Sequence, residues 1–469
     1  MPDRTALRAT RRVAVGLGGL AVAAAVVAGA TVLPVPTLDA TPAGRLVEPV
    51  PVDQLRVCPG SVLRLSDQDG AAATSSSTVG EADVTSSASS GRVEASDLQG
   101  ADGTSSRPQA LTAPVEGDGV PLVSGSQAQF VEEGDLYGFA SAPCSEPTSS
   151  TWLVGGSTQT GRVTLVTLAN PSDVNSTVDL GIVAEQGEVQ GPGIDGIVVA
   201  PRSQKVVPLS GFATGLSSPV VHVTSRGGQI VANLQESIVR TLQPGGADIV
   251  SASAGPSRTA VVPGIVVQGG ELIESVVEPD GAGDASSVVR LFVPGDEAAD
   301  VSVALADAAG SGAAFDVRVE AGRVTDVPVD GLPDGRYTAT VRASVPVVAG
   351  ARTSTATAEG LVDVAWAPSA PALTGDAQVS VAEAGGALLS IVNPGEASAS
   401  ATVVRGGAES VVEVAPGATE EVEVSPGETL TLRDVEGLRA SVSYAAPGRI
   451  ATWAVASPLP ASTPVVVHP

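Results

Sequence analysis

The residues that could carry nucleophilic or metal chemistry are few in this chain. It contains two histidines, His222 and His468, and a Ser-His-Asp triad would depend on His222. His222 lies inside a strand-like run, and no serine occupies the Gly-x-Ser-x-Gly turn that positions the nucleophile of many hydrolases. We interpret His222 as a residue on a strand face, and we predict no catalytic residue, no metal site and no cofactor.

Pairs of carboxylates could serve glycoside hydrolysis, in which two acids flank one glycosidic bond. The visible pairs are Glu132 with Glu133 and Glu420 with Glu421. Neighbouring residues of a strand point to opposite faces of its sheet, so neither pair is expected to converge on one substrate. A hydrolase of envelope glycans that uses unrecognised carboxylates stays open as the alternative function.

The two cysteines of the chain, Cys58 and Cys144, are predicted to form a disulfide, because the body of the protein is expected to fold outside the cytoplasm. The bond would close a loop of roughly 85 residues and stabilise the fold by up to about 4 kcal/mol. The count and the spacing exclude a Cys-x-x-Cys redox or zinc site.

Three tryptophans, Trp152, Trp366 and Trp453, stand at comparable places near the edges of the predicted modules. Exposed aromatic rings are the usual stacking surface for sugars, although a tryptophan in a β protein more often packs in the core. We expect core packing for most of them and retain them as candidate binding platforms. A lectin-like glycan binder is therefore a further alternative.

The formal net charge of −26 limits the partners of the protein. Binding to nucleic acid depends on neutralising phosphates with basic side chains, so nucleic acid is excluded as a partner. An anionic lipid surface is disfavoured for the same reason.

The N-terminal segment has the pattern of a membrane anchor. Four arginines within residues 1–12 precede an uncharged apolar run over 13–33, which is long enough to cross a bilayer. The positive-inside rule places residues 1–12 in the cytoplasm and the proline-rich stalk over 34–54 outside. The run Ala-Gly-Ala at 28–30 also fits a signal-peptidase site, so secretion after cleavage stays open.

An internal repeat organises the rest of the chain. Residues 161–171, 287–295 and 388–395 are each an apolar, β-branched run that ends in a proline turn. Downstream of these runs the copies match again, in short segments that begin with Val199, Val319 and Val414. A second valine follows each of these at the same distance, namely Val207, Val327 and Val422. A period of roughly a hundred residues is too long for a solenoid and favours three diverged copies of one β module.

Strand-like alternation and Pro-Gly or Asp-Gly turns continue to the C-terminus, with no convincing amphipathic helix. We therefore predict an all-β body of tandem immunoglobulin-like β-sandwich modules after one transmembrane helix, with modules over 55–255, 256–370 and 371–469. Residues 66–118 are mostly Ser, Gly, Ala, Asp and Thr, and we predict that they form a disordered insert.

Several short motifs together resemble an actinobacterial family of uncharacterised membrane-anchored secreted proteins with tandem β modules. They are the arginine-flanked span, Cys144 followed by Pro147, the run WLVGG over 152–156, and the Leu-x-Asn-Pro motif that ends at Pro171. The resemblance implies a setting in the cell envelope and no known activity, and it assigns no functional residue.

The sequence therefore predicts an extracytoplasmic, single-pass membrane protein that acts by binding or scaffolding in the bacterial cell envelope without catalysis. Its expected partner is an envelope protein or a cell-wall glycan. The sequence does not specify which.

Overall fold

The computed structural model describes residues 53–65, 76–100, 107–115, 121–240, 243–277, 285–329 and 331–458, together with short pieces at 18, 21–22, 45–47 and 465–467. The chain divides into two compact units, one of residues 1–50 with 462–469 and one of residues 51–461. In the first unit, β1 (Arg45–Val47) pairs antiparallel with β34 (Val465–Val467).

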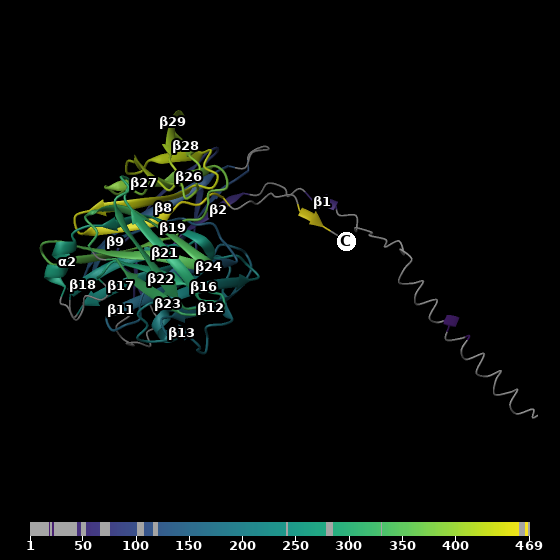
Figure 1. Ribbon diagram of the computed structural model, residues 1–469, viewed down its shortest axis with the longest axis horizontal. Helices are drawn as coiled ribbons and strands as arrows, with labels where there is room; N and C mark the ends of the chain where they lie inside the picture. Colours follow the sequence, from purple (N-terminus) through teal and green to yellow (C-terminus); the bar gives the residue numbers. More distant parts are fainter. Residues whose placement is uncertain are drawn as a thin grey trace, which may run out of the picture. The chain divides into compact units, whose positions relative to one another are not determined.

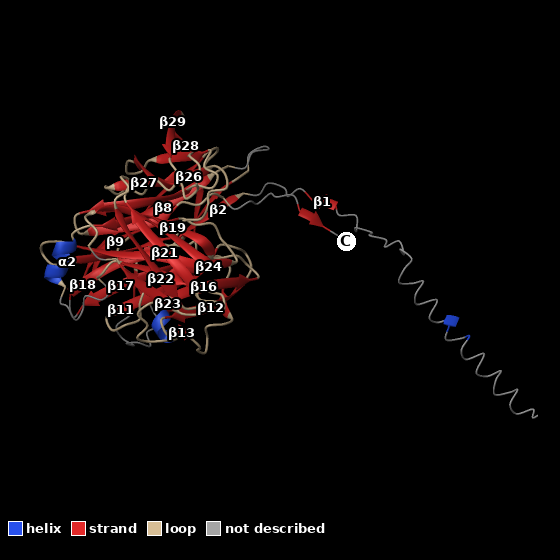
Figure 2. Cartoon of the chain, viewed as in Figure 1, coloured by secondary structure: helices blue, strands red, loops and turns tan. Residues whose placement is uncertain are grey.

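The larger unit is built almost wholly of strands, which confirms the predicted all-β class (Figure 2). Its described helices are the seven-residue α2 (Gly270–Val276) and the 3-10 turn η3 (Leu209–Gly211). The predicted anchor over 13–33 falls mostly outside the described residues. Among the residues described, no helix has the length and apolar character needed to cross a membrane.

Three successive parts of the unit repeat one arrangement of strands, and Figure 1 labels strands of each part. The first copy holds β10 (Ser150–Val154), β11 (Arg162–Asn170), β12 (Ser176–Ala184), β13 (Gly187–Glu188), β14 (Ile197–Val199), β15 (Ser203–Pro208), β16 (Val220–Arg226), β17 (Val231–Arg240) and β18 (Gln243–Val250). The second holds β19 (Ser257–Val267), β20 (Val288–Phe292), β21 (Ala299–Ala306), β22 (Gly312–Val319), β23 (Val324–Pro328), β24 (Gly335–Ala356) and β25 (Val362–Pro368). The third holds β26 (Ala377–Ser380), β27 (Ala387–Val392), β28 (Ala399–Arg405), β29 (Ala408–Val414), β30 (Thr419–Glu423), β31 (Thr429–Arg433), β32 (Arg439–Ala446) and β33 (Arg449–Ala454).

The strand order is the same in every copy. In the third copy one sheet runs β26-β31-β28-β29 and the other β30-β27-β32-β33. The first copy has β10-β16-β12, with β13 and β14 both on the outer edge of β12, and β15-β11-β17-β18. In the second copy the long strand β24 serves both sheets, because its first half pairs with β19 and β21 and its second half with β20 and β25.

The runs whose likeness indicated the repeat form the same strand of each copy, namely β11, β20 and β27. The three valines at equal offset lie on the strand that pairs with it, and they face equivalent partners: Val207 faces Val166, Val327 faces Val289 and Val422 faces Leu389. The valines therefore occupy equivalent places in the pairing of the second and fifth strands, and their constant offset is counted from Val199, Val319 and Val414, the last residues of β14, β22 and β29.

The Asn-Pro motif at the end of this strand ties a loop to the sheet. Asn170 Nδ2 donates to the carbonyl oxygens of Val174 and Val199, and its Oδ1 accepts from the N–H of Ser172. Asn393 makes the equivalent contacts in the third copy, with Ala397, Val414 and Gly395. The second copy has Val293 at this place and lacks the side-chain contacts, but it shares with the third copy a backbone hydrogen bond, from Gly322 N–H to Val293 O and from Gly417 N–H to Asn393 O respectively.

Each copy has an apolar core between its sheets, but the cores exchange residues. The first core contains Trp366 from β25 of the second copy, and the third contains Ala128 and Phe139 from strands that precede the first copy. The first and third cores are therefore completed by side chains from other parts of the same compact unit.

The strands before the first copy form smaller sheets. They are β2 (Gln54–Cys58), β3 (Leu63–Leu65), β4 (Ser76–Thr78), β5 (Asp83–Ala88), β6 (Glu94–Asp97), β7 (Gln109–Ala113), β8 (Val123–Glu133) and β9 (Leu136–Pro143). Four of them fall within 66–118, so the prediction of a disordered insert is wrong for residues 76–100 and 107–115. The few large side chains there, Val79, Leu98 and Leu111, are buried against strands distant in sequence, which local composition could not indicate.

Candidate functional site

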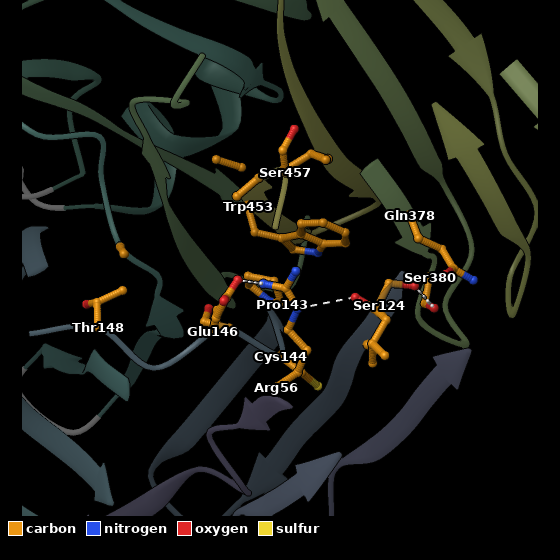
Figure 3. Close-up of a pocket in the computed structure, with 17 residues that line it drawn as sticks. Arg56, Ser124, Pro143, Cys144, Glu146, Thr148, Gln378, Ser380, Trp453 and Ser457 are labelled. Atoms are coloured by element: carbon orange, nitrogen blue, oxygen red, sulfur yellow. Dashed lines mark hydrogen bonds and ion pairs between the residues drawn. The ribbon is translucent and has the colours of Figure 1, made fainter. Parts of the chain in front are cut away.

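A cavity of about 170 Å³ lies where the strands before the first copy meet the third copy (Figure 3). One wall comes from β2, β8 and the end of β9, and it includes Arg56, Ser124 and Cys144. The opposite wall comes from β26 and from the end of β33, with Ser380 and Trp453. The cavity thus depends on segments that are far apart in the sequence.

Arg56 is the one basic side chain in the lining, and it is only 7% exposed. Its Nε donates to the carbonyl oxygen of Val123 at 3.2 Å, and its Nη1 lies 3.3 Å from Oε2 of Glu146. Burial lowers the pKa of Arg56, and the nearby Glu146 carboxylate raises it again in part. Figure 3 shows the guanidinium pointing toward the indole of Trp453.

Hydroxyl groups join the two walls. Ser124 Oγ and Ser380 Oγ are 2.6 Å apart, and Ser126 Oγ donates to the carbonyl oxygen of Ser380 at 2.7 Å. Gln378 Nε2 donates to Ser87 Oγ at 2.9 Å on the same side. These contacts fix β26 of the third copy against β8 and β5, so the cavity keeps its shape.

The predicted disulfide is confirmed. Cys58 and Cys144 are bonded with an S–S distance of 2.01 Å, and both are nearly fully buried. The bond links β2 to the segment after β9, and Cys144 forms part of the cavity wall. It therefore supports the two elements that carry Arg56 and Glu146.

The three tryptophans do not form a common surface. Trp366 is fully buried in the first core, so it is not a binding platform and that candidate role was wrong. Trp453 is 3% exposed but borders the cavity. Trp152 is half-buried, and one face of its ring is stacked on His222 with 4.0 Å between the ring centroids.

His222 lies on β16, and its Nε2 is 2.9 Å from Oγ of Ser150. Burial lowers the pKa of His222. Within the described part of the chain no carboxylate contacts this imidazole, so the Ser150–His222 pair lacks the third member that orients a catalytic histidine. The histidine packs on a strand face between a serine and a tryptophan.

The two glutamates of each adjacent pair have different surroundings and do not converge on one site. Glu132 forms an ion pair with Arg449, whereas Glu133 approaches Arg64 at 4.0 Å. Glu420 is half-buried and Glu421 is exposed on β30. Across the described residues, no group of three or more His, Cys, Asp or Glu side chains could hold a metal ion.

The most perturbed acids lie at a buried junction that sequence reasoning missed. Asp363 on β25 accepts hydrogen bonds from the backbone N–H groups of Phe139 and Ile450, both at 3.1 Å, and of Ala247 at 3.4 Å. Its oxygens thus join β9, β18 and β33 to the second copy. Burial raises the pKa of Asp363 well above its ordinary value.

Asp248 lies beside this junction. It accepts the backbone N–H of Trp366 at 2.8 Å, and Glu236 accepts the indole N–H of the same tryptophan at 2.6 Å. The pKa of Asp248 is raised to about 8, mainly by burial and in smaller part by the Glu236 carboxylate. The signal in the sequence was an acid in the middle of an apolar strand, as in the runs ADIV and LVDVAW.

Arg290 of the second copy forms hydrogen bonds to the first copy. It is fully buried, and it forms two hydrogen bonds to Asp326 and one each to the carbonyl oxygens of Gly156, Ser217 and Pro219. Burial alone would raise the pKa of Asp326, but Arg290 holds it below its ordinary value. The guanidinium also lies 4.4 Å from the ring centre of Trp366.

Comparison with known proteins points to a family without an assigned activity. The model of a family of unknown function (DUF5719) matches residues 99–433, which include most of all three copies. Arg56, Trp453 and Ser457 of the cavity lie outside that range. Comparison with curated proteins found no match. The match over most of the chain shows that it belongs to the family of unknown function DUF5719, in agreement with the uncharacterised family that its motifs resemble.

Proposed function

We propose that the protein is an extracytoplasmic, membrane-anchored binding or scaffold protein of the bacterial cell envelope, and that it performs no catalysis. The observation that carries the proposal is that the acids with the most strongly raised pKa values make structural hydrogen bonds inside the protein. Asp248 and Asp363 are buried in hydrogen bonds to backbone N–H groups of neighbouring strands. In an enzyme, groups with shifted pKa values line a cleft that the substrate can enter.

The proposed location is supported by the arginine-flanked apolar run of residues 1–33 and by a disulfide, which persists in oxidising compartments. The net charge of −26 supports a partner other than nucleic acid. The partner in this proposal is an envelope protein or a cell-wall glycan, held by loops and strand edges of a rigid β body.

We also propose that the three copies are immunoglobulin-like in the broad sense. Every copy pairs its second strand with its fifth and its third with its sixth, as that fold does. The first and seventh strands pair differently, because the first joins the sixth and the seventh joins the second.

The test is crosslinking on intact cells, followed by purification of the protein and identification of what is attached. The proposal predicts one defined envelope protein or cell-wall glycan, recovered equally with wild type and with His222→Ala. External protease should degrade the body in the same cells. Release of soluble sugar from isolated cell walls by the purified protein, abolished by substitution of a single acid, would establish the hydrolase instead.

A further inference from the structure

We propose that the Arg56 cavity binds a small molecule or chain end through a carboxylate group. This inference deepens the proposed binding function by naming the chemistry of one ligand. It rests on the hydrogen-bonding capacity of Arg56, on the composition of the cavity wall and on the size of the cavity.

The guanidinium of Arg56 has more donors than the protein uses. A guanidinium carries five N–H groups. Nε donates to Val123 O and Nη1 faces Glu146, whereas Nη2 makes no hydrogen bond to the described residues. Nη2 is not one of the fully enclosed atoms that lack a partner, so it is accessible, and a charged acceptor in the cavity can replace water there.

The geometry places that acceptor inside the cavity. The guanidinium extends from β2 toward the indole of Trp453, and the Ser124 and Ser380 hydroxyls line the same cavity to one side of them (Figure 3). One of these two hydroxyls donates to the other, so the second keeps a free proton to offer. A carboxylate bound at Nη2 would pair with the cation, and the hydroxyl donor in the same lining is available to a second polar group of the ligand.

The rest of the wall suits a short apolar substituent. It is formed largely by Val123, Pro143, Trp453 and Val455 together with small residues, and the volume of about 170 Å³ exceeds what a single water needs. Glu146 is the one acid in the lining, and it approaches Arg56 through a single contact of 3.3 Å. The cavity thus has room for a small acid beside Arg56.

The test is calorimetric titration of the full-length protein with N-acetyl-alanine and with N-acetyl-alaninamide, which has the same shape but no charge. We expect the acid to bind and the amide to bind about 10- to 100-fold more weakly, the range for a hydrogen bond to a charged group. Tri-alanine with a free carboxylate then distinguishes the sources: its binding assigns a peptide C-terminus, and its failure to bind assigns a free acid. Equal binding of acid and amide, or of neither, would overturn the proposal.

Two substitutions locate the site. Arg56→Gln should abolish the preference for the acid, whereas Arg92→Gln, the same change at an arginine whose side chain is 83% exposed, should leave it intact. Glu146→Gln removes the competing carboxylate and should tighten binding of the acid several-fold, which keeps the test decisive if Arg56→Gln does not fold. An unchanged affinity in Glu146→Gln contradicts the inference. Because partner capture on intact cells is a separate measurement, loss of carboxylate binding alone refutes this site and not the scaffold function.

Discussion

The indole N–H of Trp366, from the last strand of the second copy, donates a hydrogen bond of 2.6 Å to Glu236 in the first copy. The ring is fully buried in the first core, so a side chain of the second copy contributes to the core of the first. Trp366→Phe keeps an aromatic ring but leaves Glu236 without this donor. We expect a loss of about 1–3 kcal/mol in the free energy of unfolding, measured with urea.

Trp152→Phe is the matched control for this change. Trp152 is half-buried and stacks on His222, and the structure gives its indole nitrogen no hydrogen bond. The control should lower the free energy of unfolding by clearly less. Equal losses in the two variants would mean that the buried hydrogen bond contributes nothing.

Asp248 should make the stability fall as the pH rises. Burial raises its pKa from 3.8 to about 8 in the folded protein, so the folded state holds the proton more tightly than the unfolded chain. The stabilisation by this proton is complete below about pH 4 and is lost as the pH rises through about 8. One such group contributes a slope of up to about 1.4 kcal/mol per pH unit.

The measurement is urea unfolding of wild type and Asp248→Asn between about pH 5 and pH 9. We expect a shallower slope in the variant, because the amide does not titrate. Asp300→Asn, at an aspartate whose side chain is 78% exposed, should keep the slope of wild type. Parallel slopes for all three proteins would show that Asp248 titrates normally.

The disulfide should stabilise the strands around the cavity most directly. It closes a loop between residues that are 86 positions apart, which is worth about 4 kcal/mol at most in the chain-entropy account. Replacing both cysteines by serine should lower the melting temperature in the absence of reductant, and reductant should lower it only in wild type. Two free thiols in purified wild-type protein would contradict the bond.

Much of the architecture could be predicted from the sequence because its signals are local. The β-branched runs that end in proline mark the second strand of each copy, and the constant offset of Val207, Val327 and Val422 marks the strand that pairs with it. The disulfide followed from a count of two cysteines. Immunoglobulin-like character and membrane anchoring stay predictions.

The remaining features depend on contacts that no local pattern encodes. Ser124 and Ser380 are 256 positions apart, so nothing in either neighbourhood indicates that they share a cavity wall. Of the ordered strands within 76–113, β7 is held by pairing with β2 and β5 by pairing with β8. An acid such as Asp363 in an apolar strand indicates a buried polar contact, but its partners on three other strands become visible only in the fold.

The central claim is that the three copies form one body around the carboxylate of Asp363, and differential scanning calorimetry of Asp363→Ala tests it most directly. The substitution leaves three backbone N–H groups without their acceptor, at about 1–3 kcal/mol each. We predict one cooperative transition of residues 51–461 in wild type, shifted as a whole to lower temperature in Asp363→Ala and unshifted in Asp376→Ala, whose side chain is half exposed. Separate transitions, of which the substitution moves one and leaves the others in place, would contradict the account.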